Sequence, residues 1–199
     1  MKERILILGS VGNFGTLEII KEKWELLSHR FSSDFLRELE NEIEEESTIL
    51  NNLILDQYDK YKEELFKVSN GGVLSALWNF CEKEKRGLEY SLKDIPIMQG
   101  TIEVCEIFKI NPYRLLCFEV YILKTDIERA NEILQSLHNN NINANIIGEL
   151  TNRKERIRID NEEKSFLTKE QKDEIDKVLP NYIKIMKKKE DNNYTSITE

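Results

Sequence analysis

The stretch RLLCFEVYILK, residues 114–124, is the strongest strand signal in the chain and sets the class of fold. It is apolar enough to lie inside a sheet, where both faces of a strand are covered. Residues 3–8 predict a second buried strand, which is followed by an amphipathic helix over 16–27. Other strands and helices are mixed without a regular βαβ repeat. We therefore expect an α/β (α+β) fold, a mixed β-sheet with helices on both faces.

A helix is predicted from Ser33 or Asp34, and the acidic stretch NEIEEES, residues 41–47, predicts an exposed joint after it. An apolar stripe follows, which favours core packing over the alternative of a partner-binding helix. Its members are Leu50, Ile54, Tyr58, Tyr61 and Leu65. Thr125 and Glu128 predict a capping box for a helix that runs to Leu137. The alternating segment ERIRID, residues 155–160, predicts an edge strand.

The length of 199 residues suits one domain, which we expect over 1–180 with a flexible tail over 181–199. The net charge of -8 argues against binding nucleic acid, because phosphate neutralisation needs a basic face. No apolar run approaches the length of a membrane span, and no signal-like segment follows the charged start. We therefore expect a cytoplasmic protein with no membrane partner.

The cysteines are odd in number and widely spaced, so we expect Cys81, Cys105 and Cys117 to be reduced, buried thiols. The two histidines, His29 and His138, have no ligand at metal-like spacing. The sequence therefore predicts no metal site.

Three glycines follow the first predicted strand. Gly9, Gly12 and Gly15 have the spacing G-x-x-G-x-x-G, whereas a dinucleotide-binding turn needs G-x-G-x-x-G. No G-K-[ST] follows Gly15, so a P-loop is excluded as well. These glycines indicate a strand-to-helix loop.

The segment Ser69-Asn70-Gly71-Gly72 opens a predicted helix and is a candidate anion site. Free N–H groups and the helix dipole favour negative charge there, and glycine permits close approach of a ligand. The alternative is that Ser69 or Asn70 caps the helix and the glycines allow tight packing. Lys67, two residues earlier, is either a partner for a phosphate or a solvated surface group.

Several blocks in the second half of the chain, in the right order, resemble the C-terminal domain of the AIR synthase superfamily. They are VSNGGVLSALW (68–78), DIPIMQGTIEVCEIFKINPYRLL (94–116) and NANIIGELT (143–151). The superfamily includes AIR synthase, selenophosphate synthetase, thiamine-monophosphate kinase and the hydrogenase maturation factor that dehydrates a carbamoyl group. The resemblance is greatest to the last of these and to AIR synthase-related proteins, and it covers roughly residues 1–180.

The resemblance implies an AIR synthase C-terminal-domain-like fold and two candidate site segments. Relatives have a loop W-x-G-x-E-G-T at the mouth of a cleft, which Gly12, Gly15 and Thr16 match, whereas Asn13 and Phe14 do not. The segment that aligns with Ser69–Gly72 lines the cleft that receives phosphate groups in relatives. Lys67, Ser69, Asn70, Gly71 and Gly72 are therefore the candidate phosphate-binding residues, and Gly12, Asn13, Gly15 and Thr16 the candidate cleft loop.

In full-length relatives an N-terminal domain supplies most ATP and metal ligands. We expect that half to be missing from this polypeptide, so no cofactor is intrinsic and ATP with Mg²⁺ comes only with a partner chain. Lys67 replaces an acidic residue of the relatives, and Cys117-Phe118-Glu119 replaces a small Ser/Gly segment. A carboxylate beside Cys117 would raise the pKa of its thiol, which argues against a nucleophile. The reactive C-terminal cysteine of the maturation factor is also missing.

No catalytic residue is assigned on this evidence, and we expect a chain that is not an autonomous enzyme. The first hypothesis is a non-catalytic module for binding or regulation, associated with phosphate or nucleotide. The second is a split ATP-dependent synthase or dehydratase, whose ATP-binding domain is a separate protein. The third is a scaffold that binds partners through acidic helices over 34–65, including Glu44, Glu45 and Glu46. Self-association is expected if apolar surface is left exposed.

Overall fold

The structure is a computed structural model that describes residues 3–57, 64–161, 163–169 and 172–186. Within these residues a seven-stranded sheet has the order β2-β4-β1-β5-β3-β6-β7. Its strands are β1 (Arg4–Leu8), β2 (Leu65–Val68), β3 (Gly87–Tyr90), β4 (Val120–Thr125), β5 (Ala144–Thr151), β6 (Arg156–Asp160) and β7 (Glu163–Phe166). Neighbouring strands are antiparallel except β3 and β6, which are parallel. The mixed α/β architecture is thus confirmed.

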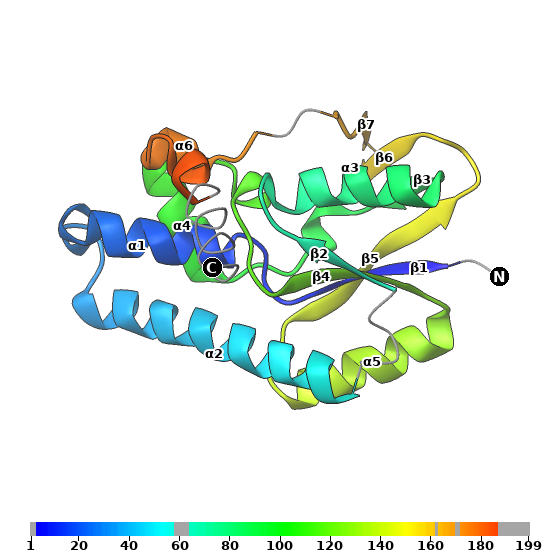
Figure 1. Ribbon diagram of the computed structural model, residues 1–199, viewed down its shortest axis with the longest axis horizontal. Coiled ribbons are helices and arrows are strands. Elements are labelled where there is room, and N and C mark those ends of the chain that lie inside the picture. Colours follow the sequence, from blue (N-terminus) through cyan, green and yellow to red (C-terminus); the bar gives the residue numbers. More distant parts are fainter. Residues whose placement is uncertain (1–2, 58–63, 162, 170–171, 187–199) are drawn as a thin grey trace, which may run out of the picture.

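The helices that accompany the sheet (Figure 1) include α1 (Asn13–Ser28), α2 (Ser33–Gln57), α3 (Gly72–Glu84), α4 (Gln99–Phe108), α5 (Ile127–Asn139) and α6 (Ile175–Val178). Strand β1 separates two cores, because its side chains alternate between the faces of the sheet. Ile5 and Ile7 belong to the core that contains α3. Leu6 and Leu8 belong to the core that contains α2 and α5. Helices therefore cover both faces, as expected.

A third apolar cluster lies at one end of the sheet, where α1, α4 and α6 gather (Figure 1). Leu27 of α1, Val104 of α4 and Ile175 of α6 are buried together there. The partly buried Tyr182 packs against this cluster and donates a hydrogen bond to Glu18 Oε2 at 2.5 Å. Residues 182–186 are helical, inside the segment expected as a tail, and 187–199 lie outside the described residues.

The strand expected over 114–124 is interior to the sheet but much shorter than predicted. Only Val120–Thr125 is strand β4, which pairs with β1 on one side and β2 on the other. Residues 112–114 form a 3-10 turn, η3, and 115–119 form a loop. Glu119 has φ +50°, a left-handed conformation that ends the extended backbone just before the strand. Apolar composition alone did not reveal this break.

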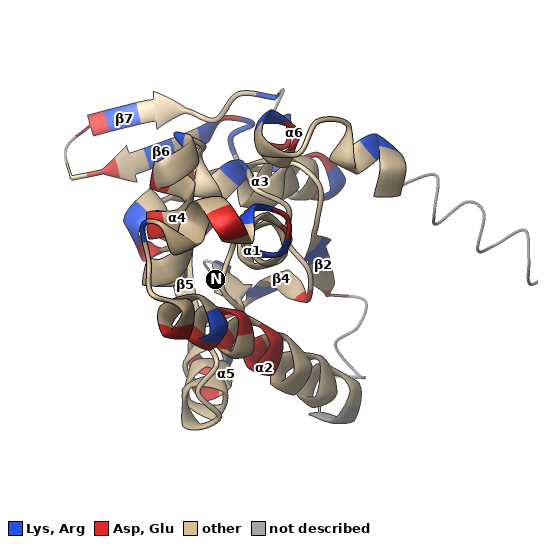
Figure 2. Ribbon diagram, turned by 90° about the vertical axis from the view of Figure 1, so that its left-hand side faces the viewer, with Lys and Arg blue, Asp and Glu red and all other residues tan. Residues whose placement is uncertain are grey.

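The predicted joint at 41–47 is wrong, because α2 is continuous from Ser33 to Gln57. A buried stripe at Leu36, Ile43, Leu50 and Ile54 runs through the acidic stretch at helical spacing. Apart from the buried Glu46, the acidic residues of this stretch occupy the remaining faces of α2 (Figure 2). Of the expected stripe, Tyr58 and Tyr61 lie outside the described residues. Leu65 begins β2 instead of continuing the helix.

Two smaller predictions are also corrected. Asp126, and not Thr125, caps α5, because its side chain accepts a hydrogen bond from Arg129 N at 3.0 Å. Thr125 is the last residue of β4. Strand β6, predicted at the edge, is interior, since β7 pairs with its free side.

Candidate functional site

The two segments predicted as site loops are joined by a third segment, Leu115–Glu119, which we call the bridging segment. The N–H of Gly12 donates to Cys117 Sγ at 3.1 Å. The N–H of Cys117 donates to the carbonyl oxygen of Ser69 at 3.4 Å. Residues far apart in sequence are thus brought together in front of the first turns of α1 and α3.

The predicted cleft loop is packed tightly against the bridging segment. Asn13 is 2% exposed, and its side chain donates to the carbonyl of Phe118 at 2.8 Å and accepts from the N–H of Phe118 at 3.1 Å. Thr16 is also buried and bonds Gly12 O. A Cβ on Gly15 would lie 2.4 Å from Leu115 Cγ. These four predicted residues are therefore used in internal packing, with Asn13 holding the backbone of Phe118.

The predicted phosphate loop has exposed and buried parts. Ser69 and Asn70 are exposed, whereas Gly71 and Gly72 are buried with φ of +81° and +65°. The N-cap of α3 is Gly71, and no side chain caps this helix, so the prediction that Ser69 or Asn70 does so is wrong. The N–H of Gly71 instead donates to Oδ2 of Asp173 at 2.7 Å.

Asp173 supplies a carboxylate at the position where the sequence predicted an external anion. Its Oδ1 accepts from the N–H groups of Leu116 at 3.2 Å and Ile175 at 3.0 Å, while Oδ2 accepts from Gly71. Burial raises the pKa of Asp173, although the three N–H donors act in the opposite direction. Sequence reasoning missed this residue, because Asp173 follows Gly71 by 102 positions. No local pattern signals a contact of that range.

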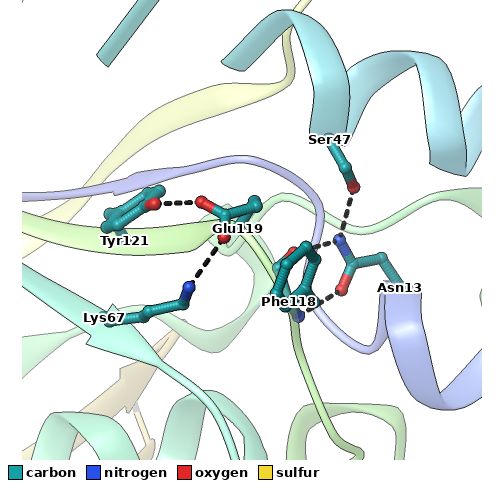
Figure 3. A network of polar contacts seen from close by, with 6 residues as sticks. All are labelled: Asn13, Ser47, Lys67, Phe118, Glu119 and Tyr121. Carbon is teal, nitrogen blue, oxygen red and sulfur yellow. Dashed lines mark hydrogen bonds and ion pairs between the residues drawn. The ribbon is translucent and has the colours of Figure 1, made fainter. Parts of the chain in front are cut away.

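Lys67 lies on β2 at the edge of the sheet and forms an ion pair with Glu119 (Figure 3). The Lys67 Nζ to Glu119 Oε1 distance is 2.7 Å, and the second carboxylate oxygen accepts from the hydroxyl of Tyr121. Glu119 is 7% exposed, so removing Lys67 would leave a buried carboxylate without its cationic partner. Lys67 Nζ also lies 4.7 Å from the ring centroid of Phe118. The Lys67 side chain is 48% exposed to solvent but is paired with an internal carboxylate, with which a phosphate would therefore have to compete.

Phe118 (Figure 3) is an exposed aromatic side chain that the sequence interpretation did not single out as a site. It is 49% exposed, and its ring centroid is 5.7 Å from that of Phe14. Both rings line a surface cavity of about 360 Å³ between α1 and α2, which Lys21, Glu44 and Ser47 also line. Half-exposed aromatic residues at a cavity are typical of binding surfaces.

Cys117 is a buried thiol, as predicted, and so are Cys81 and Cys105. Burial, with a smaller contribution from the nearby Asp173 carboxylate, raises the pKa of Cys117 to about 12, although the hydrogen bond from the Gly12 N–H acts in the opposite direction. The predicted direction is right, but Glu119 is not the cause, since its carboxylate is bound to Lys67. A thiol with this pKa is almost entirely protonated near neutral pH and is a poor nucleophile.

The acidic run on α2 divides into exposed and buried residues. Glu44 and Glu45 are exposed, whereas Glu46 is 5% exposed. The carboxylate of Glu46 accepts from Ser10 N, from Ser10 Oγ and from Asn143 N. Glu46 therefore fastens α2 to the loops after β1 and before β5, and only the other two glutamates are open to a partner.

Among the described ranges, no group of three or more His, Cys, Asp or Glu side chains is arranged to hold a metal ion. Within the same ranges, no helix has both the length and the apolar character needed to cross a bilayer.

No protein-family model and no curated protein matches this sequence. Solved structures do match it. E. coli HypE, a hydrogenase maturation protein, aligns with a TM-score of 0.67 and 18% identity, over 88% of this chain and 52% of HypE. HypE in complex with ATP aligns with a TM-score of 0.58 and 15% identity, over 88% of this chain and 52% of that chain. T. maritima PurL complexed with FGAR aligns with a TM-score of 0.53 and 16% identity, over 82% of this chain and 26% of PurL.

The chain has the fold of an AIR synthase-like domain. The resemblance stated from sequence is thereby confirmed for the fold, which is all that identities of this size establish. The chain spans about half the length of the HypE structures that it matches. In this fold the NGG block and the N-P-Y-R-L-L block are in contact. Gly72 packs directly on the backbone of Tyr113 and Arg114.

Proposed function

We propose that this chain is an AIR synthase-type C-terminal domain that acts as a non-catalytic binding or regulatory module associated with phosphate or nucleotide. One observation carries the proposal: three chemically capable groups around the bridging segment are buried or held by a partner within the chain. The Cys117 thiol is buried, Lys67 is paired with Glu119, and the N–H of Gly71 is bound to Asp173. Groups held in this way suit reversible binding better than bond-breaking chemistry.

The proposed phosphate site includes Ser69, Asn70, Gly71 and Gly72, with Lys67 nearby. A phosphate at the first turn of α3 would receive the same N–H group that Asp173 now accepts from. Ligand and carboxylate therefore compete, and binding would release the segment that carries Asp173. This competition is the regulatory element of the proposal.

Calorimetric titration with ATP and Mg²⁺, with phosphate release measured in parallel, tests the absence of catalysis. We expect weak binding and no phosphate release, because the three cysteine thiols are buried and no acidic metal cluster is found among the described residues. The Asp173→Ala variant frees the Gly71 N–H and should bind more tightly than the parent chain. Tight binding with turnover by the unmodified chain would remove the proposal.

A split enzyme is the second candidate, in which a companion ATP-binding domain supplies nucleotide and Mg²⁺. It is favoured by Phe118, an aromatic side chain 49% exposed beside Phe14 at the edge of the bridging segment. An exposed aromatic side chain that packs on a partly buried one is suited to anchor a contact between protein domains. Self-association through the same surface is the competing outcome. The acidic scaffold is the weakest candidate, because Glu46 is committed to internal hydrogen bonds.

Co-expression with a companion ATP-binding domain encoded nearby tests the split-enzyme candidate. Phe118→Ser should abolish co-purification, because it removes the aromatic anchor and leaves the fold intact. Phe166→Ser is the matched control, since Phe166 is 72% exposed on β7, at the opposite edge of the sheet from β2. Equal loss of binding in both variants would contradict a specific role for Phe118.

A further inference from the structure

A second, cationic cavity lies at the opposite end of α3 from the bridging segment. It has a volume of about 240 Å³ and is lined by Cys81, Glu82, Lys85, Arg86, Lys154 and Arg156. These residues come from the last turn of α3, the turn that follows it, and the residues around the start of β6. Since α3 has 13 residues, the two ends are roughly 20 Å apart. The cavity is therefore separate from the proposed phosphate site.

The cavity carries an excess of positive charge in a chain whose net charge is -8. Arg156 is paired with Glu82, and Arg86 is paired with Glu3, which lies just outside the lining. Lys85 and Lys154 are exposed and form no ion pair with any described residue. Two cations thus remain uncompensated at the mouth of the cavity.

Arg156 is held in place before any ligand arrives. Its side chain is 11% exposed, and its guanidinium carbon lies 3.9 Å from the ring centroid of Trp78. Nε of Arg156 and Nε of Arg86 are buried without a hydrogen-bond partner. A guanidinium fixed by stacking loses little conformational freedom when it binds a planar or tetrahedral oxyanion. Arg156 therefore supplies a guanidinium that is already oriented by stacking. Arg86 is held by Glu3 and by a hydrogen bond to Leu150 O.

The end of a helix normally disfavours anions, because its last carbonyls carry negative partial charge. Here the turn after α3 reduces that effect. The N–H groups of Lys85 and Arg86 donate to Glu82 O and Cys81 O. The nearby carboxylate of Glu84 is bound to Lys124. The positive side chains therefore dominate the cavity.

We propose that this cavity binds a phosphate dianion, either free or as the terminal group of a phosphorylated small molecule. Arg156 and Arg86 would bind the oxyanion through their guanidinium groups. Lys85 and Lys154, at the mouth of the cavity, would add positive charge that attracts the anion. The inference does not depend on the proposed function, because it involves other residues at the other end of α3.

Trp78 makes the site measurable, since the chain has two tryptophans and Trp78 touches Arg156. In a Trp24→Phe background, the full chain is titrated with inorganic phosphate, and sodium chloride of matched ionic strength serves as reference. We expect a saturable change in Trp78 emission that chloride does not reproduce. Calorimetry of the same titration gives a second, independent reading of binding. Tighter binding of glycerol 3-phosphate would identify a phosphorylated metabolite, and tighter binding of inorganic phosphate would identify the free ion.

Variants distinguish this cavity from general attraction of anions. Lys85→Asn should weaken phosphate binding by about tenfold, the loss expected for one charge-assisted contact, and Lys154→Glu should weaken it more, because it also adds a repelling charge. Arg30→Ala, which removes an exposed cation at the far end of α1, should leave the affinity unchanged. Thermal unfolding checks that both lysine variants fold like the parent. The proposal would be overturned if sodium chloride changed the Trp78 emission as much as phosphate does. It would also be overturned if both lysine variants bound phosphate with the affinity of the parent chain.

Discussion

Asp173→Ala is expected to lower the free energy of unfolding by about 2–4 kcal/mol, since three backbone donors lose a buried acceptor. The donors are the N–H groups of Gly71, Leu116 and Ile175, which belong to three separate segments. Removing their shared partner should loosen the first turn of α3, the bridging segment and α6 together. Chemical denaturation with circular dichroism measures the change.

Asp176→Ala is the control, because Asp176 is an exposed carboxylate in the same segment with one long hydrogen bond to Ile183 N. It should cost less than about 1 kcal/mol. If both variants lost the same stability, the interpretation of Asp173 as a shared buried acceptor would be wrong.

The contribution of Asp173 to the free energy of unfolding should depend on pH with an unusual sign. Burial raises the pKa of Asp173 above its ordinary value, so the folded chain binds this proton more tightly than the unfolded chain does. Stability from this group is fully present below the ordinary aspartate pKa and is lost as pH rises through the raised pKa. Most paired carboxylates behave in the opposite way. The stability difference between the parent and Asp173→Ala should therefore shrink as pH rises across that window.

Gly72→Ala is expected to destabilise the chain by about 2–5 kcal/mol, from a left-handed backbone and from overpacking together. Gly72 has φ +65°, and a Cβ there would lie 2.6 Å from the carbonyl oxygen of Tyr113 and 2.8 Å from the backbone of Arg114. Neither neighbour is a flexible side chain that can move away. A lowered melting temperature in a thermal scan would show the effect.

Ser75→Ala, on the same helix, should change the free energy of unfolding by no more than about 0.5 kcal/mol. A Gly72→Ala variant as stable as this control would mean that α3 and η3 can separate at little cost. That result would contradict the close packing of the NGG and N-P-Y-R-L-L blocks.

The sequence predicted best what depends on short-range periodicity. The buried strand before Gly9, the helix after it, the helix behind Gly71 and the mixed sheet all follow from patterns of apolar side chains. The acidic stretch at 41–47 failed as a signal, because charge on the outer faces of α2 hid an uninterrupted buried stripe. Residues 115–119 failed for the opposite reason, since an apolar loop looks like a strand until a left-handed residue is recognised.

The candidate site was predicted in part. The NGG segment and the loop at Gly12 lie in the same region of the structure. The Gly12 loop contacts the bridging segment, and the NGG segment contacts Asp173. Contacts between residues more than 50 positions apart, such as Lys67 with Glu119, cannot be predicted from local sequence patterns. The role of Lys67 therefore could not be derived from its own neighbourhood, because its partner decides it.

The position of β1 affects how this chain can be assembled during synthesis. RILIL occupies the interior of the sheet, yet both strands beside it belong to the stretch from Val120 to Thr151. This apolar strand therefore emerges from the ribosome long before its partner strands are synthesised. Until then it is unpaired and prone to aggregate with other polypeptides. This part of the sheet cannot form until residues up to Thr151 have been translated, so we expect early chaperone contact at residues 4–8.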